Sequence, residues 1–549
     1  MCMSTQPEGG VVLKRAMSRL DLTMAGLGAI IGSGWLFGGL YAANDAGPAA
    51  VVGWIIGGIA VMLIGLVYAE LSGMAPEAGG IARYPHFTHG PLVGFVMSWG
   101  AFLAYASVAA IEAEAVVQYA EHYIPSLAKS SLERFIIEVL LLILFFAINS
   151  YGVKVFAKTN TIVTTFKFLT PGLTILLFLF IAKHWGNYTA TATGGFAPYG
   201  TSGILKAVAS SGIIFAFLGF RQAVDLAGEA KNPQKDVPRA IITAIAIGMV
   251  LYTLLQFVFI AAIDPKGLSK GWAGLNLTSP FAQVASAIGL GWLAVILYFD
   301  AVVSPAGTGN VYLASTARVL YASANNRYLP APFRKLSPKS SVPFLALLVT
   351  LIGGIIFLLP FPSWQSLVGV ISAATVFTYM IGPISAAVLR KTESDAHRPF
   401  TLSGLSVIGP IAFIVGTLII YWTGWGIDWK LIVALLVGAI IYSIVASRTG
   451  TTLDKVDGVA AKAAIWLFGY LVAMLLMSYF GSAAFGAPYN HGKGLIHYPL
   501  DLVVDAILGL AFYYWGVASG IKTEAGSAAM LVAKNDRLAR LSDEEKSNN

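Results

Sequence analysis

The stretch that most constrains the fold is residues 27–37, which read Leu-Gly-Ala-Ile-Ile-Gly-Ser-Gly-Trp-Leu-Phe. Three glycines and one serine fall within seven positions: Gly28, Gly32, Ser33 and Gly34. Glycine weakens a helix interior, and in hydrocarbon an interrupted helix survives only where it is buried in protein or lines a cavity. The stretch therefore predicts either a helix broken near the middle of a membrane or a face of small residues for close helix packing.

Composition places the chain among polytopic membrane proteins. Of its 549 residues, 57% are apolar and 11% are charged, and the mean hydropathy is +0.75. A soluble domain of this size does not need so much apolar surface and so little charge. The single cysteine, Cys2, excludes a disulfide framework and a cysteine-based metal site. The first residues lack the short apolar segment of a cleaved signal peptide.

Windows of about 20 apolar residues predict about fourteen membrane-spanning helices. They are residues 20–43, 49–74, 91–121, 133–152, 158–182, 203–230, 238–263, 290–322, 343–360, 364–389, 405–424, 429–447, 461–483 and 499–520. The connections are mostly short and leave no room for a separate soluble domain. We expect the tail after Lys522 to be a short amphipathic or disordered cytoplasmic end.

The net charge of +8 is explained by topology and does not require nucleic-acid binding. With these spans, 25 lysines and arginines fall on one side of the membrane and 8 on the other. The positive-inside rule then predicts that both termini are cytoplasmic. Lys167 and Arg221 remain inside apolar runs.

A second glycine-containing interruption occurs in the sixth predicted span. Residues 211–221 read Ser-Gly-Ile-Ile-Phe-Ala-Phe-Leu-Gly-Phe-Arg, and Phe217 lies about 21 Å from Gly203 at helical rise. Two broken helices five spans apart are typical of inverted five-helix repeats, whose binding site lies between the first and sixth helices. The pairing favours the broken-helix interpretation of both stretches.

Four segments resemble the amino acid–polyamine–organocation superfamily of transporters, in register along the chain. Residues 28–34 are similar to its first-helix motif, and residues 68–80 to its second-helix end and the following loop. Residues 215–240 resemble its sixth helix and signature loop, and residues 316–330 the end of its eighth helix.

The resemblance implies an all-α fold with five-plus-five inverted repeats, broken first and sixth helices and about four C-terminal helices. The domains would be an N-terminal tail (1–19), a transport core (20–182 and 203–389), peripheral helices (390–520) and a cytoplasmic tail (521–549). Most relatives have twelve spans, so fourteen are a departure. The longer C-terminal region resembles the subgroup that contains bacterial aspartate–proton symporters.

The two breaks predict a site for an α-amino acid. Backbone N–H groups at a half-helix N-terminus bind a carboxylate, and freed carbonyl groups near residues 215–217 accept hydrogen bonds from an ammonium group. Phe215, Phe217 and Trp35 are candidates to close over the substrate, although aromatic residues in apolar helices also pack. The predicted substrate-binding residues are Ile30, Gly32, Ser33, Gly34, Phe215, Ala216, Phe217, Gly219 and Arg221.

Lys167 is the predicted proton-coupling residue. It lies about 14 Å from Lys158 along the fifth span, too deep for its amine to reach water easily. A lysine there costs about 2.5–3.5 kcal/mol on insertion scales, and burial disfavours the charged amine. In proton-coupled members of the resembled family, a fifth-helix lysine at the matching position takes the place of sodium. The alternative is a permanently charged amine that bonds first-helix carbonyl groups.

Arg221 follows Gly219-Phe220, where relatives usually carry Gly-Phe-Glu. Its planar fork suits a carboxylate, so one hypothesis is recognition of the side chain of an acidic amino acid. The other is a structural pair with Asp225, one helical turn further on.

Asp300 is an isolated aspartate in the eighth span. Three roles are open to it: it could carry a proton, fix an arginine or bind the substrate amine. The resemblance suggests that a hydroxyl or amide on the same helix holds Lys167. The candidates are Ser304, Thr308 and Asn310. We expect Glu112 and Glu114 to face an outer vestibule, with a proton relay as the alternative.

Glu70, Glu77 and Arg83 are expected to form a cytoplasmic charge network. The histidines lack metal-ligand spacing, and no phosphate-binding loop occurs, so we expect neither a metal nor an organic cofactor.

The sequence thus predicts a proton-coupled symporter of the cell membrane for the acidic amino acids aspartate and glutamate, which works by alternating access. Its partners would be the amino acid, protons and the lipid bilayer, with no nucleic acid. A neutral amino acid symporter and an exchanger remain alternatives within the class. A membrane-embedded enzyme lacks a convergent set of catalytic side chains, and a non-transporting nutrient sensor would be expected to carry a signalling domain.

Overall fold

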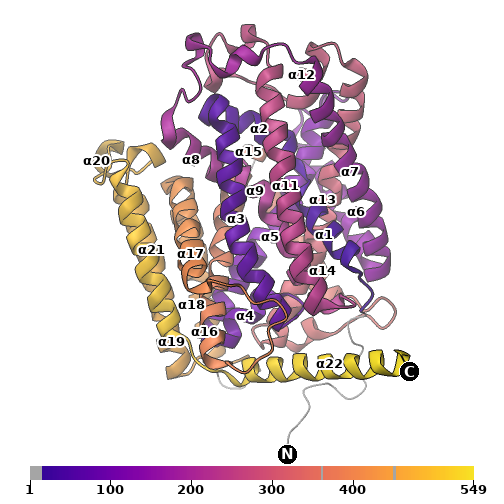
Figure 1. Ribbon diagram of the computed structural model, residues 1–549, viewed down its shortest axis with the longest axis vertical. Coiled ribbons are helices and arrows are strands. Elements are labelled where there is room, and N and C mark those ends of the chain that lie inside the picture. Colours follow the sequence, from indigo (N-terminus) through magenta and orange to yellow (C-terminus); the bar gives the residue numbers. More distant parts are fainter. Residues whose placement is uncertain (1–14, 360–362, 449–452, 549) are drawn as a thin grey trace, which may run out of the picture.

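The computed structural model describes residues 15–359, 363–448 and 453–548. Within these residues the secondary structure is helical, and the only β pairings are two isolated bridges. In the described residues, ten helices are long and apolar enough to cross a membrane, or eleven if one bent pair counts as a single span. The prediction of an all-α polytopic membrane protein is confirmed (Figure 1).

The predicted spans that are not among these helices correspond to helices that are broken, charged or short. Span 20–43 is divided between α1 (Arg19–Ile30) and α2 (Ser33–Ala46). Span 133–152 matches α6 (Ser131–Ser150), which carries three charged residues, and span 343–360 matches α14 (Phe344–Leu358), which has 15 residues.

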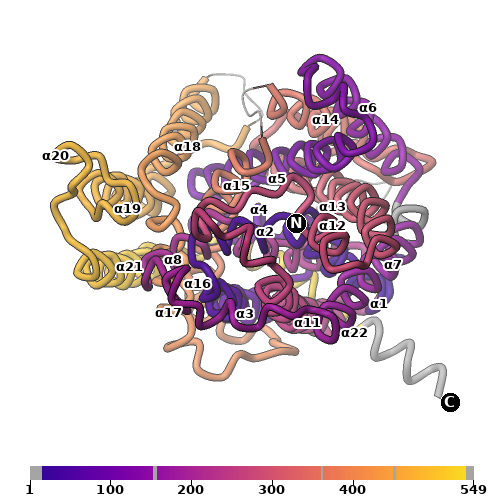
Figure 2. The backbone as a smooth tube through the Cα atoms, turned by 90° about the horizontal axis from the view of Figure 1, so that it is seen from above, coloured from indigo at the N-terminus to yellow at the C-terminus, as the bar shows by residue number. Residues whose placement is uncertain are grey.

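The other principal helices of residues 50–392 pack around the first and sixth spans (Figure 2). They are α3 (Ala50–Met74), α4 (Gly80–His89), α5 (Pro91–Ala120), α7 (Val153–Ile181), α11 (Pro233–Ala262), α12 (Pro280–Ala287), α13 (Gly291–Asn325), α15 (Trp364–Tyr379) and α16 (Ile381–Thr392). The boundaries that we drew between repeats, core and peripheral helices stay a prediction.

The first span is broken where its glycines predict. Ser18 and Asp21 form a capping box that starts α1, and the helix ends at Ile30. Gly32 leaves the helical conformation, with φ −122° and ψ −143°, before α2 starts at Ser33. The last carbonyl groups of α1 and the first N–H groups of α2 therefore have no hydrogen-bond partner within their own helices.

The sixth span breaks at the start of the predicted stretch 211–221, ahead of residues 215–217, where we expected freed carbonyl groups. Helix α8 (Gly200–Ser210) and the segment Ile213–Asp225 are bent by 46° at Ser211 and Gly212. Gly212 has φ +95°, a conformation that favours glycine. The Phe215 carbonyl group is not free, because it accepts from the Leu218 N–H group as α9 (Ile213–Phe217) tightens into a 3₁₀ turn.

The two interrupted spans lie directly against one another. A Cβ atom on Gly219 would lie 2.4 Å from the backbone carbon of Ala29 and from the nitrogen of Ile30. A Cβ atom on Gly34 would lie 2.9 Å from the Cβ atom of Ala216. Four predicted site residues thus meet at the contact between the breaks, and glycine permits this approach.

Four further helices form a peripheral group beside these spans: α17 (Leu405–Thr423), α18 (Trp425–Ala446), α19 (Gly458–Phe480) and α21 (Leu500–Ser519). The short α20 (Tyr489–Gly492) caps one end of this group (Figure 1). The tail forms a helix, α22 (Glu524–Asn548), which lies across the opposite end of the bundle. Asp536 of α22 forms an ion pair of 2.5 Å with Arg15, so both described ends of the chain lie at this end.

We predict that Gly219→Ala destabilises the protein by about 1–3 kcal/mol or prevents folding, because the added methyl group would overlap backbone atoms of α1. The thermal midpoint of the purified protein measures the effect. Gly172→Ala is the matched control, because a Cβ atom on this glycine of α7 would meet nothing within 4 Å. A Gly219→Ala protein as stable as wild type would contradict the close contact between the spans.

Candidate functional site

Lys167 of α7 reaches the end of α1 at the first break. Its amine donates to the carbonyl oxygen of Gly28 at 2.5 Å and to the hydroxyl oxygen of Thr308 at 2.8 Å. The Thr308 hydroxyl in turn lies 2.7 Å from the same carbonyl oxygen. Lys167 is fully buried and none of the described ion pairs includes it. The amine therefore ties α1, α7 and α13 together at the break.

Of the three candidate partners of Lys167, only Thr308 contacts it. Ser304 instead donates to a carboxyl oxygen of Asp300 at 2.8 Å. Asn310 accepts from Asn149 at 2.8 Å, on the other side of the helix. Asp300 is fully buried, and none of the described residues is hydrogen-bonded to its second oxygen.

The start of α2 holds a carboxylate that belongs to the protein itself. The Ser33 N–H group donates to Glu112 of α5 at 2.9 Å. A Cβ atom on Gly32 would lie 2.7 Å from the other oxygen of Glu112 and 2.6 Å from the Thr308 hydroxyl, so a larger residue would collide with both groups. Glu112 is fully buried, and the expectation that it faces a vestibule is wrong. A helix N-terminus attracts a carboxylate, and Glu112 supplies one here.

Aromatic side chains donate hydrogen bonds to further groups of the two interrupted spans. The Tyr252 hydroxyl donates to the Ile30 carbonyl oxygen at 2.6 Å, and the Tyr379 hydroxyl donates to that of Leu218 at 2.6 Å. The Trp364 indole donates to the Ser33 hydroxyl at 2.7 Å. These three residues were not among the predicted site residues, because a lone aromatic residue in an apolar span carries no signal of its role.

The aromatic candidates differ in what they contact. Phe215 packs edge-on against Trp364, with ring centroids 5.8 Å apart, and Trp364 covers Ser33. Phe217 packs against Trp54 and Tyr252. Trp35 packs against Phe281 at 5.3 Å. Only Phe215 thus belongs to the cover of the break, whereas Phe217 and Trp35 pack between helices.

Arg221 is fully buried and pairs with Asp225, with 3.1 Å between nitrogen and oxygen. Its guanidinium group lies 4.4 Å from the ring centroid of Tyr105 and 4.9 Å from that of Tyr379. The structural pair that we considered is therefore present. The Nε atom of Arg221 has no hydrogen-bond partner among the described residues.

The predicted charge network is formed only in part. Glu77 pairs with Arg83 at 3.4 Å, but Glu70 pairs with Arg390 of α16 at 2.6 Å. A separate pair joins Arg318 of α13 to Glu229 at 2.7 Å. Glu114 is also buried, in an ion pair with Arg134 at 2.5 Å, and does not face open solvent.

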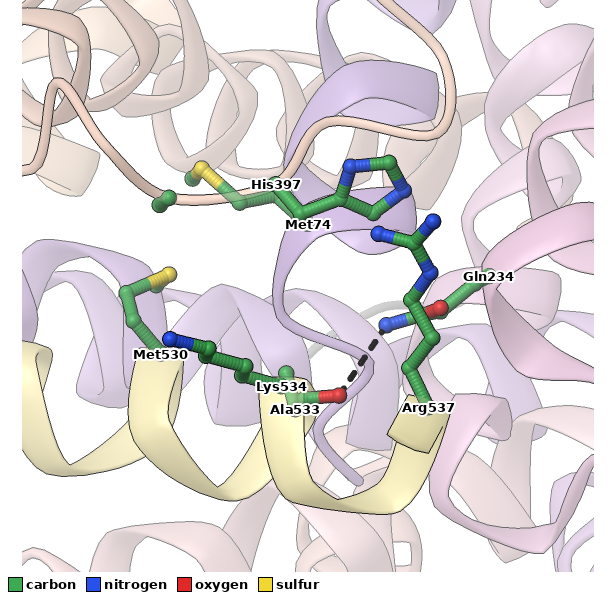
Figure 3. Close-up of a pocket in the computed structure, with 8 residues that line it drawn as sticks. Met74, Gln234, His397, Met530, Ala533, Lys534 and Arg537 are labelled. Atoms are coloured by element: carbon green, nitrogen blue, oxygen red, sulfur yellow. Dashed lines mark hydrogen bonds between the residues drawn. The ribbon is translucent and has the colours of Figure 1, made fainter. Parts of the chain in front are cut away.

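A hollow beneath the bundle lies away from the breaks. Figure 3 shows it between α22, which contributes Met530, Lys534 and Arg537, and His397 of the connection after α16. Burial and the nearby Arg537 lower the pKa of His397. Gln234 donates to the Ala533 carbonyl oxygen here, so this hollow marks the docking of α22.

Comparison with known proteins identifies the family. The family model described as "Amino acid permease" matches residues 17–441, which include both breaks, Lys167 and Arg221. The chain belongs to the amino acid permease family. Permeases move their substrates unchanged, so the chain is a transporter and not an enzyme.

Two curated relatives match the permease over nearly its full length. It is 42% identical over 522 residues to the glutamate/serine transporter AimA of Bacillus subtilis (strain 168), covering 93% of this chain and 95% of the relative. It is 40% identical over 519 residues to the aspartate-proton symporter of the same organism, covering 93% and 98%. The branched-chain amino acid permease BcaP, also of B. subtilis, is 26% identical over 459 residues.

We predict that Thr308→Val lowers uptake by the permease by roughly 10-fold or more, because it removes the hydroxyl that bridges Lys167 and Gly28 at nearly constant volume. Initial uptake rates of labelled amino acid measure the effect. Thr308→Ser should retain most of the activity, since it keeps the hydroxyl. Equal rates for the valine and serine variants would show that the bridge is dispensable.

Proposed function

We propose that the permease takes up an acidic amino acid together with a proton, by alternating access in the cell membrane. The observation that carries this proposal is the buried amine of Lys167 on the Gly28 carbonyl group at the broken helix. The names of the two similar relatives, one an aspartate-proton symporter and one a glutamate/serine transporter, support the substrate class and the coupling.

Proton coupling would act through the amine of Lys167. A charged amine makes strong hydrogen bonds to the Gly28 carbonyl and the Thr308 hydroxyl, which hold α1 against α7 and α13. Loss of the proton weakens these bonds and frees α1 to move relative to its neighbours. Asp300, buried on the same face of α13 two turns from Thr308, is the second group proposed to take part in proton transfer.

The substrate would bind where Glu112 now lies. Its α-carboxylate would replace the Glu112 carboxylate at the Ser33 N–H group, and Phe215 with Trp364 would cover it. In the described structure all of these side chains are buried, so substrate must enter through a more open state. Displaced Glu112 would then need a proton or a new partner, which links substrate binding to protonation.

Arg221 would recognise the side-chain carboxylate of the substrate by exchanging it for Asp225. This exchange keeps the buried guanidinium group paired, which the low-polarity surroundings require. Because one relative is named for serine as well as glutamate, a transporter of small neutral amino acids is the second candidate.

The proposed orientation of the protein in the membrane rests on the distribution of its charged residues. The bias of lysine and arginine favours a cytoplasmic location for both tails, and the Arg15–Asp536 pair at one end of the bundle agrees with this topology.

We expect Lys167→Ala to abolish accumulation of labelled aspartate driven by an inward proton gradient in sodium-free proteoliposomes, while exchange of labelled for unlabelled substrate continues. Lys158→Ala, which removes an exposed lysine of the same helix, is the matched control and should accumulate like wild type. Undiminished proton-driven accumulation by Lys167→Ala would refute the assignment.

The double variant Arg221→Gln/Asp225→Asn tests recognition while it avoids leaving one buried charge unpaired. We expect aspartate uptake to fall by roughly 10-fold or more, as for loss of a charged hydrogen bond, with serine uptake largely kept. Equal changes for both substrates would show that the pair is structural.

A further inference from the structure

The peripheral group, α17, α18, α19 and α21, contains three buried aspartates. Asp428 of α18 and Asp501 and Asp505 of α21 are each at most 1% exposed. None of them takes part in any ion pair of the described residues. They lie toward the end of the group that α20 caps, opposite α22 (Figure 1).

Two of the three carboxyl groups have hydrogen-bond donors. Asp428 accepts from Thr423 and Ser478, both at 2.7 Å. Asp501 accepts from the Tyr421 hydroxyl at 2.8 Å and from the Leu502 N–H group at 2.9 Å. Both lie in the first turn of their helices, where the helix dipole favours negative charge.

Asp505 has no such support. It lies one helical turn deeper than Asp501 on the same face of α21 and is fully buried. Neither of its oxygens has a hydrogen-bond partner in the part of the chain that the structure describes. Among the described residues, the ionisable groups close enough to interact electrostatically with Asp505 are Asp428 of α18, Asp501 of its own helix, Tyr421 of α17 and Tyr470 of α19. All of these groups are neutral or negative, so none can compensate a charge on Asp505.

A buried carboxylate without donor or counter-charge must bind a proton or a cation. Among the residues that the structure describes, no three acidic, histidine or cysteine side chains are grouped so that they could hold a metal ion. A proton needs no such grouping, because it bonds to a single oxygen.

We propose that Asp505 is a proton-binding site, separate from Lys167, that ties the packing of the peripheral group to pH. With the proton bound, the neutral carboxyl group packs among α17, α19 and α21. When the proton leaves, the carboxylate repels Asp428 and Asp501 and loosens the group. Nothing in the transport cycle proposed above uses this residue.

Thermal unfolding of the full-length protein in detergent tests the proposal at about pH 6 and about pH 9.5. Asp505→Asn mimics the protonated carboxyl group and cannot ionise. We expect its thermal midpoint to match wild type at the lower pH and to exceed it by roughly 3 °C or more at the higher pH. Asp395→Asn, which removes an exposed carboxyl group of the connection after α16, is the control and should show no such gain at high pH.

A second measurement follows the bound proton directly. An infrared band of protonated carboxyl groups should be present in wild-type protein at neutral pH and weaken at alkaline pH, and the component that is lost should be missing from Asp505→Asn at both pH values. Two results would overturn the proposal: an unchanged pH dependence of the midpoint in Asp505→Asn, or stabilisation of wild type but not of Asp505→Asn when sodium chloride replaces choline chloride. The latter result would assign the site to a metal cation.

Discussion

The structure depends on how backbone groups freed at two helix breaks find partners where water is scarce. An unpaired carbonyl or N–H group in hydrocarbon costs several kcal/mol, so each break needs donors and acceptors from neighbouring helices. Lys167, Thr308 and Tyr252 supply donors to the carbonyl groups at the end of α1, and Glu112 accepts from the start of α2. Four elements far apart in sequence are thereby fixed around one point.

These hydrogen-bond partners also make the break in the first span sensitive to protonation and to substrate. A helix end held by a lysine amine and by a carboxylate can be released by a change in protonation, because each loses much of its hydrogen-bond strength when it becomes neutral. A substrate with its own carboxylate competes for the same N–H group that Glu112 occupies. The chemistry required for coupled transport thus coincides with the chemistry that stabilises the broken helix.

Much of this arrangement could be predicted from the sequence. Hydropathy located the helices, and the glycines of residues 28–34 located the first break, because backbone flexibility in an apolar run is a local signal. Lys167 was singled out because a lysine in hydrocarbon needs a partner, and Thr308 was among the partners proposed for it.

What the sequence did not reveal depends on three-dimensional packing. Glu112 looked like a residue near a helix end, and only the placement of α5 puts it in the gap of the first span. The bend falls at Gly212, before the aromatic residues near which we expected freed carbonyl groups, and α8 packs there against α2 and α15. The roles of Tyr252 and Trp364 likewise depend on tertiary contacts that no local pattern encodes.

The most direct test of the central claim is an experimental structure with bound aspartate. The account predicts density for the α-carboxylate at the Ser33 N–H group, Glu112 turned away, and the Lys167 amine beside the Gly28 carbonyl oxygen. Aspartate bound elsewhere, with Glu112 still on Ser33, would contradict it.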